Sequence, residues 1–259
     1  MMQRLIALLT RFVPRHVLQQ FTHWTILRIA FLWSGDHFED PISGKTYKKM
    51  LPYGRVNPRP NALAPHSLSL ERHRTVWLYL KKHTDFFDAS LRMLHLAPEY
   101  CYLKLFRQMK NLDYVTGDLN SPWADHHFDV HEIPFDDNSF DVVMANHLLE
   151  HVDDDQAVMR EFYRVMKPGG WGIFQVPIDY KNPQTEEDRS ITDPAERERL
   201  YWQRDHLRLF GHEDYPRRLR HAGFDLVVHN VAEEVGKVLS DRYALGEEHF
   251  VYFVSKPLT

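Results

Sequence analysis

The order of apolar and polar positions in residues 140–177 predicts a strand, a helix and a second strand in succession. Residues 140–145 form a short apolar run, typical of a strand buried on both faces. The apolar positions that follow fall on one face of a helix: Val158, Met159, Phe162, Val165 and Met166. Asp153 is expected to cap this helix, with Gln156 completing a capping box, and residues 167–170 to end it. Such a unit is a right-handed crossover in a parallel sheet, so a ligand site is expected where its strands end.

The rest of the chain continues this alternation of strands and helices. Further apolar runs predict strands at residues 91–96, 113–116, 224–231 and 249–254. Helices are expected at residues 75–83, 100–109 and 213–221. Between the strand at 113–116 and the segment at 128 the chain is too short for a full crossover helix. The pattern predicts an α/β fold with a mostly parallel sheet.

Residues 178–204 interrupt this pattern with a polar, charged stretch. Asp193, Pro194 and Glu196 give a strong helix-start signal inside it. An insertion between a strand and the next helix is a common place for a substrate lid. The alternative is a solvated surface helix, and the sequence favours neither.

Residues 1–33 are predicted to form two helices broken at Pro14. Four arginines precede the first acidic residue, Asp36. A basic, apolar segment can lie on an anionic membrane surface, but a helical lid packed on the main domain is the favoured interpretation. The apolar runs within it are too short for a signal peptide or a membrane span.

Residues 34–75 are rich in turn-forming residues and too poor in apolar ones to build a core of their own. Residues 40–43 (DPIS) and 64–67 (APHS) have the spacing of two CxxC knuckles with every cysteine replaced. Zinc requires thiolate or imidazole ligands, which these positions largely lack. We therefore expect no metal here, and expect the module to keep its shape by packing on the larger domain.

Composition excludes several classes of protein. The 259 residues carry a net charge of −4, so nothing indicates a nucleic-acid partner. The single cysteine, Cys101, excludes an internal disulfide and fits a cytoplasmic location. The 17 histidines are scattered without an HExxH pattern, and no metal site is predicted.

Four segments together resemble the class I S-adenosylmethionine-dependent methyltransferases, and the type 11 group in particular. These are residues 133–135 (IPF), 140–143 (FDVV), 149–151 (LEH) and 164–170 (RVMKPGG). The resemblance extends over residues 91–257, and other stretches are similar to a subfamily with an N-terminal zinc ribbon, degenerate here. It implies a Rossmann-like sheet whose last strand is antiparallel. The expected domains are a helical segment (1–33), a ribbon-like module (34–75) and a methyltransferase domain (76–259) with the lid insertion.

The resemblance also implies S-adenosylmethionine as cofactor and a set of residues that bind it. Asp118, where the second strand ends, is expected to accept bonds from the ribose hydroxyls, and Asp129 from the adenine amine. The full expected set is Leu96, Ala97, Pro98, Glu99, Asp118, Leu119, Asp129, Val130, Asn146, His147 and Leu148.

The first loop departs from the family pattern. Where the family has an acidic residue and a glycine-rich loop, this chain has His95-Leu-Ala-Pro-Glu99 without a glycine. Pro98 also lacks a backbone N–H. We hypothesise that the Glu99 carboxylate holds the ammonium group of the cofactor instead.

The predicted activity is methyl transfer to a small-molecule or lipid-like acceptor. Positioning the two reactants in line is the main requirement, and a general base is needed only for a protonated acceptor. The candidates for that base are His147, His151 and His206. One alternative is a catalytically inactive binding protein with a methyltransferase fold, and another is a peripheral membrane enzyme that uses residues 1–33.

Overall fold

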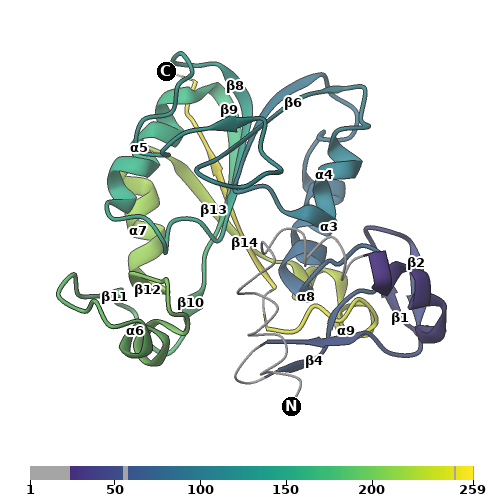
Figure 1. Cartoon of the computed structure of the whole chain (residues 1–259). Helices are drawn as coiled ribbons and strands as arrows, with labels where there is room; N and C mark the ends of the chain where they lie inside the picture. Colours follow the sequence, from purple (N-terminus) through teal and green to yellow (C-terminus); the bar gives the residue numbers. More distant parts are fainter. Residues whose placement is uncertain (1–23, 55–57, 248, 259) are drawn as a thin grey trace. The chain divides into compact units, whose positions relative to one another are not determined.

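The computed structural model describes residues 24–54, 58–247 and 249–258 (Figure 1). The chain divides into two compact units, each treated separately below. The small unit comprises Met1–His83 and Asn230–His249, and the large unit comprises Thr84–His229 and Phe250–Thr259. The division differs from the predicted domain boundary, because residues 76–83 and 230–249 fold with the small unit.

The large unit contains a seven-stranded sheet in the order β13-β14-β9-β8-β5-β6-β7. Pairing is parallel from β9 through β8, β5 and β6 to β7, whereas β14 is antiparallel to β9. This arrangement confirms the predicted fold class. The strands are β5 (Leu91–Leu96), β6 (Leu112–Asp118), β7 (His126–His127), β8 (Phe140–Asn146), β9 (Met166–Gln175), β13 (Asp225–Asn230) and β14 (Phe250–Ser255). No helix lies between β6 and β7 in this described stretch, as predicted.

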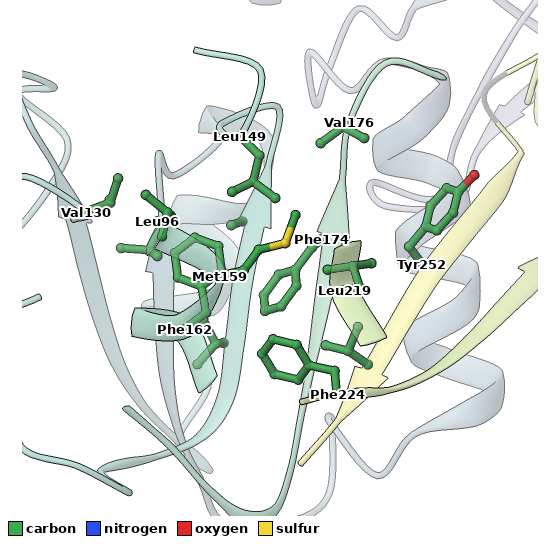
Figure 2. Close-up of a cluster of buried hydrophobic side chains, with 14 of the residues drawn as sticks. Leu96, Val130, Leu149, Met159, Phe162, Phe174, Val176, Leu219, Phe224 and Tyr252 are labelled. Atoms are coloured by element: carbon green, nitrogen blue, oxygen red, sulfur yellow. The ribbon is translucent and has the colours of Figure 1, made fainter. Parts of the chain in front are cut away.

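Helices α5 (Asp155–Val165) and α7 (Asp214–His221) lie on one side of the sheet and α4 (Tyr100–Phe106) on the other (Figure 1). Four of the five residues predicted on the apolar face of this helix are buried residues of α5, namely Val158, Met159, Phe162 and Val165, whereas Met166 is the first residue of β9. Phe162 packs on Phe174 of β9, with ring centres 4.9 Å apart, and Phe174 packs on Phe224 at 5.5 Å (Figure 2). These aromatic contacts hold α5 against β9, the strand beside β8.

The start of α5 was predicted one residue too early. Asp154, not Asp153, is the N-cap residue, and its carboxylate accepts a 2.9 Å bond from the Ala157 N–H. The predicted capping box is therefore absent. Asp155, the first residue of α5, pairs with Arg218 at 3.0 Å.

The end of α5 also differs from the prediction. The helix ends at Val165, and residues 167–170 lie within β9 instead of forming a separate turn. Pairing between β8 and β9 shifts from Phe140↔Met166 to Val142↔Trp171, so these residues are accommodated as an irregularity of the strand. Gly169 adopts a left-handed φ of 77° there.

The insertion after β9 forms a small sheet of its own, in the order β10-β12-β11. Its strands are β10 (Ile178–Asp179), β11 (Glu186–Glu187) and β12 (Arg208–Gly211), with α6 (Pro194–Tyr201) between the last two. The predicted helix start is confirmed, because Asp193 is the N-cap and Pro194 the first helical residue.

The small unit contains two hairpins and several helices among its described residues. The elements are the 3-10 helix η1 (Ala30–Trp33), β1 (Ser34–Asp40), β2 (Lys45–Tyr47), β3 (Leu51–Tyr53), β4 (Arg59–Leu63), α3 (Glu71–His83), α8 (Val231–Val235) and α9 (Lys237–Arg242). The fully buried Arg74 of α3 joins the two chain segments that make up the small unit. Its guanidinium donates to the Tyr243 and Ala244 carbonyls, both at 2.7 Å. The helix predicted at 75–83 starts at residue 71, so this arginine lies inside it.

The first knuckle-like segment, residues 40–43, is hydrogen-bonded to Ser69, which lies two residues after the second segment. The buried Asp40 carboxylate accepts from the Ser43 hydroxyl at 2.5 Å and from the Ser69 hydroxyl at 3.1 Å. It also accepts from the Ile42 and Ser43 amides, both at 3.2 Å. The Asp40 carboxylate thus holds parts of the module together from within. That the module also keeps its shape by packing on the larger domain stays a prediction.

Among the described residues, no helix is both long and apolar enough to cross a membrane. The prediction of two helices in residues 1–33 falls mostly outside the described part of the chain. Its last stretch, residues 24–29, is helical and continues into η1.

Candidate active site at the carboxyl ends of the parallel strands

The loop after β5 retains a left-handed turn without a glycine. Ala97 has a φ of 48°, and its N–H donates a 2.9 Å bond to the Gly117 carbonyl of β6. An L-residue in this conformation costs about 1–2 kcal/mol, which is why glycine is usual there. The loop therefore makes at Ala97 a turn of the kind that glycine favours.

Glu99 lies in a polar network that links three neighbouring strands. Its carboxylate contacts His95 Nε2 at 2.7 Å and accepts from Asn146 Nδ2 at 2.9 Å. The other ring nitrogen of His95 contacts the Tyr114 hydroxyl at 2.7 Å. Asn146 Oδ1 is buried and has no hydrogen-bond partner. An unpaired acceptor beside a carboxylate is suited to a cationic N–H donor.

The two acidic residues assigned to the nucleoside end differ in how their oxygens are used. Asp118 Oδ1 accepts from the amides of Asn120 and Ser121 at 2.8 and 2.6 Å, and within the described chain Oδ2 has no such partner. Asp129 accepts from the His131 amide at 2.9 Å, and this bond is the main cause of its lowered pKa. The Asp129 carboxylate is therefore an ionised acceptor at neutral pH.

Other residues of the predicted cofactor set occupy different environments. Leu96 and Val130 are buried in the core, so only their backbone can meet a ligand. Leu119 is 61% exposed. Leu148 packs against the core, and Pro98 has no amide to donate.

The three predicted histidines come together around a carboxylate that sequence reasoning missed. Glu150 is fully buried, and its Oε1 accepts from His147 Nδ1 at 3.0 Å. His206 Nε2 lies 4.0 Å from the same oxygen, and the His206 ring packs edge-on against His151 at 4.8 Å. The signal was present in the sequence, because Glu150 stands between two histidines in the NHLLEH stretch.

The backbone after β8 is arranged to hold this cluster. His147 has a left-handed φ of 54°, and its N–H donates to the Gln175 carbonyl at 2.7 Å. Burial opposes ionisation of Glu150, but the bond from His147 and the neighbouring imidazoles outweigh it and lower its pKa. Burial also lowers the pKa of His206. At neutral pH the cluster therefore combines an ionised carboxylate with a neutral imidazole.

Arg208 of β12 anchors the loop that carries the cluster. Its buried guanidinium donates to the carbonyls of Leu149, Val152 and Asp153 at 2.8, 2.5 and 2.9 Å. It also pairs with Glu187 of β11 at 2.9 Å. The insertion is thereby fastened to the loop after β8.

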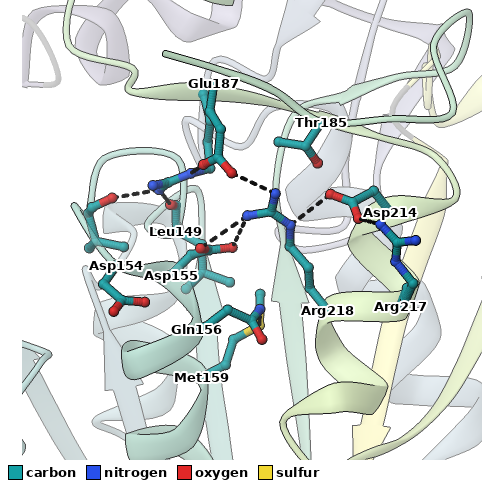
Figure 3. A network of polar contacts seen from close by, with 12 residues as sticks. Leu149, Asp154, Asp155, Gln156, Met159, Thr185, Glu187, Asp214, Arg217 and Arg218 are labelled. Carbon is teal, nitrogen blue, oxygen red and sulfur yellow. Dashed lines mark hydrogen bonds and ion pairs between the residues drawn. The ribbon is translucent and has the colours of Figure 1, made fainter. Parts of the chain in front are cut away.

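Arg218 of α7 extends this anchoring. It lies between Asp155, Glu187 and Asp214, at 3.0, 2.8 and 2.7 Å respectively (Figure 3). The start of α5, the insertion and α7 thus share one network of charges.

Comparison with known proteins agrees with this architecture. The methyltransferase type 11 family, described as a methyltransferase domain, matches residues 76–174. The ubiquinone/menaquinone biosynthesis C-methyltransferase of Desulfotalea psychrophila is 50% identical over 42 residues, which are 16% of this chain and 17% of that protein. The phosphoethanolamine N-methyltransferase of Triticum aestivum is 30% identical over 116 residues, 44% of this chain and 21% of that protein. The chain therefore spans less than a quarter of the length of either relative.

A solved structure resembles nearly the whole chain. The crystal structure of the (4+2)-cyclase SpnF has a TM-score of 0.54 and 16% sequence identity, and covers 93% of this chain and 97% of its own. At this identity the likeness concerns the fold alone. The methyltransferase type 11 family matches residues 76–174, and the strand order, with antiparallel β14 beside β9, is that of the Rossmann-like fold of class I S-adenosylmethionine-dependent methyltransferases.

Proposed function

We propose that this protein binds S-adenosylmethionine and transfers its methyl group to a small-molecule acceptor. The observation that carries the proposal is the buried, unpaired Asn146 Oδ1 beside Glu99. An acceptor and a carboxylate at this end of the sheet fit the ammonium of the cofactor's methionine portion. The left-handed turn at Ala97 supports the same assignment, because it keeps the loop in the course that glycine normally allows.

Each part of the cofactor has a candidate partner. Glu99 and Asn146 would hold the ammonium, Asp118 Oδ2 a ribose hydroxyl and Asp129 the adenine amine. When bound, the cofactor supplies an electrophilic methyl group on a sulfonium. Transfer forms the bond from methyl to acceptor and breaks the bond from carbon to sulfur, which leaves S-adenosylhomocysteine. A protonated acceptor loses its proton to a base.

The histidine cluster supplies the candidates for that base. His147, His151 and His206 keep this proposed role, and the His151 side chain is 31% exposed, the most of the three. Some relatives are named for quinone precursors and one for phosphoethanolamine, so a small hydroxylated or amine acceptor is in keeping with the proposal. A lipid-like acceptor that carries a hydroxyl or amine group is equally in keeping with the proposal.

Titration calorimetry of the full chain with S-adenosylmethionine and S-adenosylhomocysteine tests cofactor binding. We expect micromolar affinity, and at least a tenfold loss for Glu99→Gln. The exposed Glu132→Gln is the matched control and should bind like the wild type. If the wild type binds neither compound at millimolar concentration, the protein is a non-catalytic member of the fold. Equal affinity of Glu99→Gln and wild type would remove Glu99 from the site.

A cytoplasmic location and a peripheral membrane contact through residues 1–33 both stay predictions. Co-sedimentation with anionic liposomes, comparing the full chain with one that lacks residues 1–33, tests the contact. Binding by the full chain alone supports it, and binding by neither removes it.

A further inference from the structure

The side chains of Glu150, His151 and His206 form a compact group of metal-ligating type. One ligand atom from each lies within 4.8 Å of the others. Glu150 and His206 are 0% and 1% exposed, so the group is not a chance cluster of surface charges. His151 and Glu150 follow β8, and His206 immediately precedes β12, so two separate parts of the large unit contribute.

Two atoms of this group are buried without a hydrogen-bond partner. These are Glu150 Oε2 and His206 Nε2. An unsatisfied buried polar atom costs about 1–3 kcal/mol, and more when it is charged. Removing a carboxylate from water is especially unfavourable unless a cation compensates it. A cation bound to these two atoms would compensate both of them.

The outer contacts of the histidines leave the correct nitrogens free. His206 Nδ1 lies 2.7 Å from the Tyr201 carbonyl, and His151 Nδ1 lies 3.2 Å from the Asp205 carbonyl. A carbonyl can only accept, so both Nδ1 atoms carry a proton, and in the neutral imidazole the Nε2 atom then has the lone pair that a metal needs. Histidines that bind metals are commonly oriented by a second bond of this kind. His147 gives Glu150 a similar support through Oε1.

We propose that Glu150, His151 and His206 bind a divalent transition-metal ion. Two imidazoles and one carboxylate suit Zn²⁺ or Fe²⁺, whereas Mg²⁺ and Ca²⁺ prefer sites built from oxygen ligands. Three protein ligands leave a coordination position open for water or a substrate oxygen. The sequence did not predict this site, because Glu150, His151 and His206 match no recognised metal motif.

A role for the ion rests on the proposed function. Asn146 ends β8, and Glu150 and His151 lie in the loop that follows it, so a bound ion would be placed to hold an oxygen of the acceptor. A metal-bound hydroxyl loses its proton more readily, which would make the acceptor oxygen a better nucleophile. His151 and His206 would then be ligands and not general bases.

Metal binding can be measured without any methyl transfer. The full chain, free of affinity tags, is stripped with a chelator and titrated with Zn²⁺ by calorimetry. Substitution with Co²⁺ then reports the ligand geometry through its visible absorption. We expect one tightly bound Zn²⁺ per chain. Glu150→Gln and His206→Gln should each weaken that binding at least tenfold and change the Co²⁺ spectrum.

His212→Gln is the matched control, because His212 contacts the Asn182 carbonyl in the same unit and lies outside the group. Circular dichroism establishes that each variant is folded, and His151→Gln replaces any variant that is not. The proposal is overturned if the wild type does not bind Zn²⁺ at micromolar concentration, or if Glu150→Gln binds it like His212→Gln. Metal binding without S-adenosylmethionine binding would keep this site while rejecting the methyltransferase function.

Discussion

Replacing Arg208 tests whether the loop after β8 is held by the insertion. The guanidinium donates to three loop carbonyls and pairs with Glu187. Arg208→Ala leaves these acceptors without their donor, although Glu187 keeps its bond to Arg218. Removing one partner of a buried ionic network costs about 3–5 kcal/mol, because the remaining groups stay desolvated. We expect the free energy of unfolding of the large unit to fall by that amount.

Arg208→Lys separates charge from geometry. An ammonium keeps the charge but cannot reach the same set of acceptors as a planar guanidinium, so the expected loss is about 1–3 kcal/mol. Arg199→Ala is the control, because Arg199 is 65% exposed and pairs only with Glu196 on α6. That change should alter the free energy of unfolding by less than about 0.5 kcal/mol.

Urea unfolding followed by near-ultraviolet circular dichroism gives these free energies. Hydrogen exchange adds a local measurement, since the amides of residues 147–153 should exchange faster in Arg208→Ala than in wild type. The reasoning is refuted if Arg208→Ala unfolds within about 1 kcal/mol of wild type and its loop exchanges at the wild-type rate.

Three further substitutions test other features by the same unfolding assay. Ala97→Gly relieves about 1–2 kcal/mol of strain but adds about 0.4–1 kcal/mol of unfolded-state entropy, so stability should stay equal or rise slightly. A clear loss would contradict the left-handed turn. Asp40→Ala should cost about 3 kcal/mol through its lost bonds, against almost nothing for the exposed Asp36→Ala. Hydrogen bonds from Arg164 lower the pKa of Glu161, so its contribution is present above its ordinary pKa of 4.5 and lost as pH falls further. Glu161→Gln should thus be less stable than wild type at neutral pH, and the difference should shrink as the pH falls below 4.5; a constant difference across pH would contradict this.

The strands were predictable because burial on both faces leaves a continuous apolar run. The first strand, β5, has the predicted bounds, and the face that α5 buries was read correctly from its periodicity. The turns were not predictable in the same way. Ala97 and His147 adopt left-handed conformations that favour glycine, so nothing in their residue type announces them.

Details that depend on distant partners were also beyond the sequence. The sequence offers Asp153 and Asp154 as neighbouring candidates for the helix cap, and the ion pair of Asp155 with Arg218 joins it to a residue far along the chain. The importance of Glu150 depends on its burial beside His206, a residue of another segment. The residue types could be read from the sequence, but the contact between Glu150 and His206 in the folded protein could not.

The place of β14 in the sheet has a consequence for the order of folding. This strand is an inner member that pairs with β9, yet residues 230–249 of the small unit precede it in the chain. During synthesis the β9 edge stays unpaired until the second segment of the small unit has been made. Unpaired edges invite association between chains, and such distant pairing is slow. The newly made protein should therefore be most prone to aggregation, and most dependent on chaperones, just before β14 emerges.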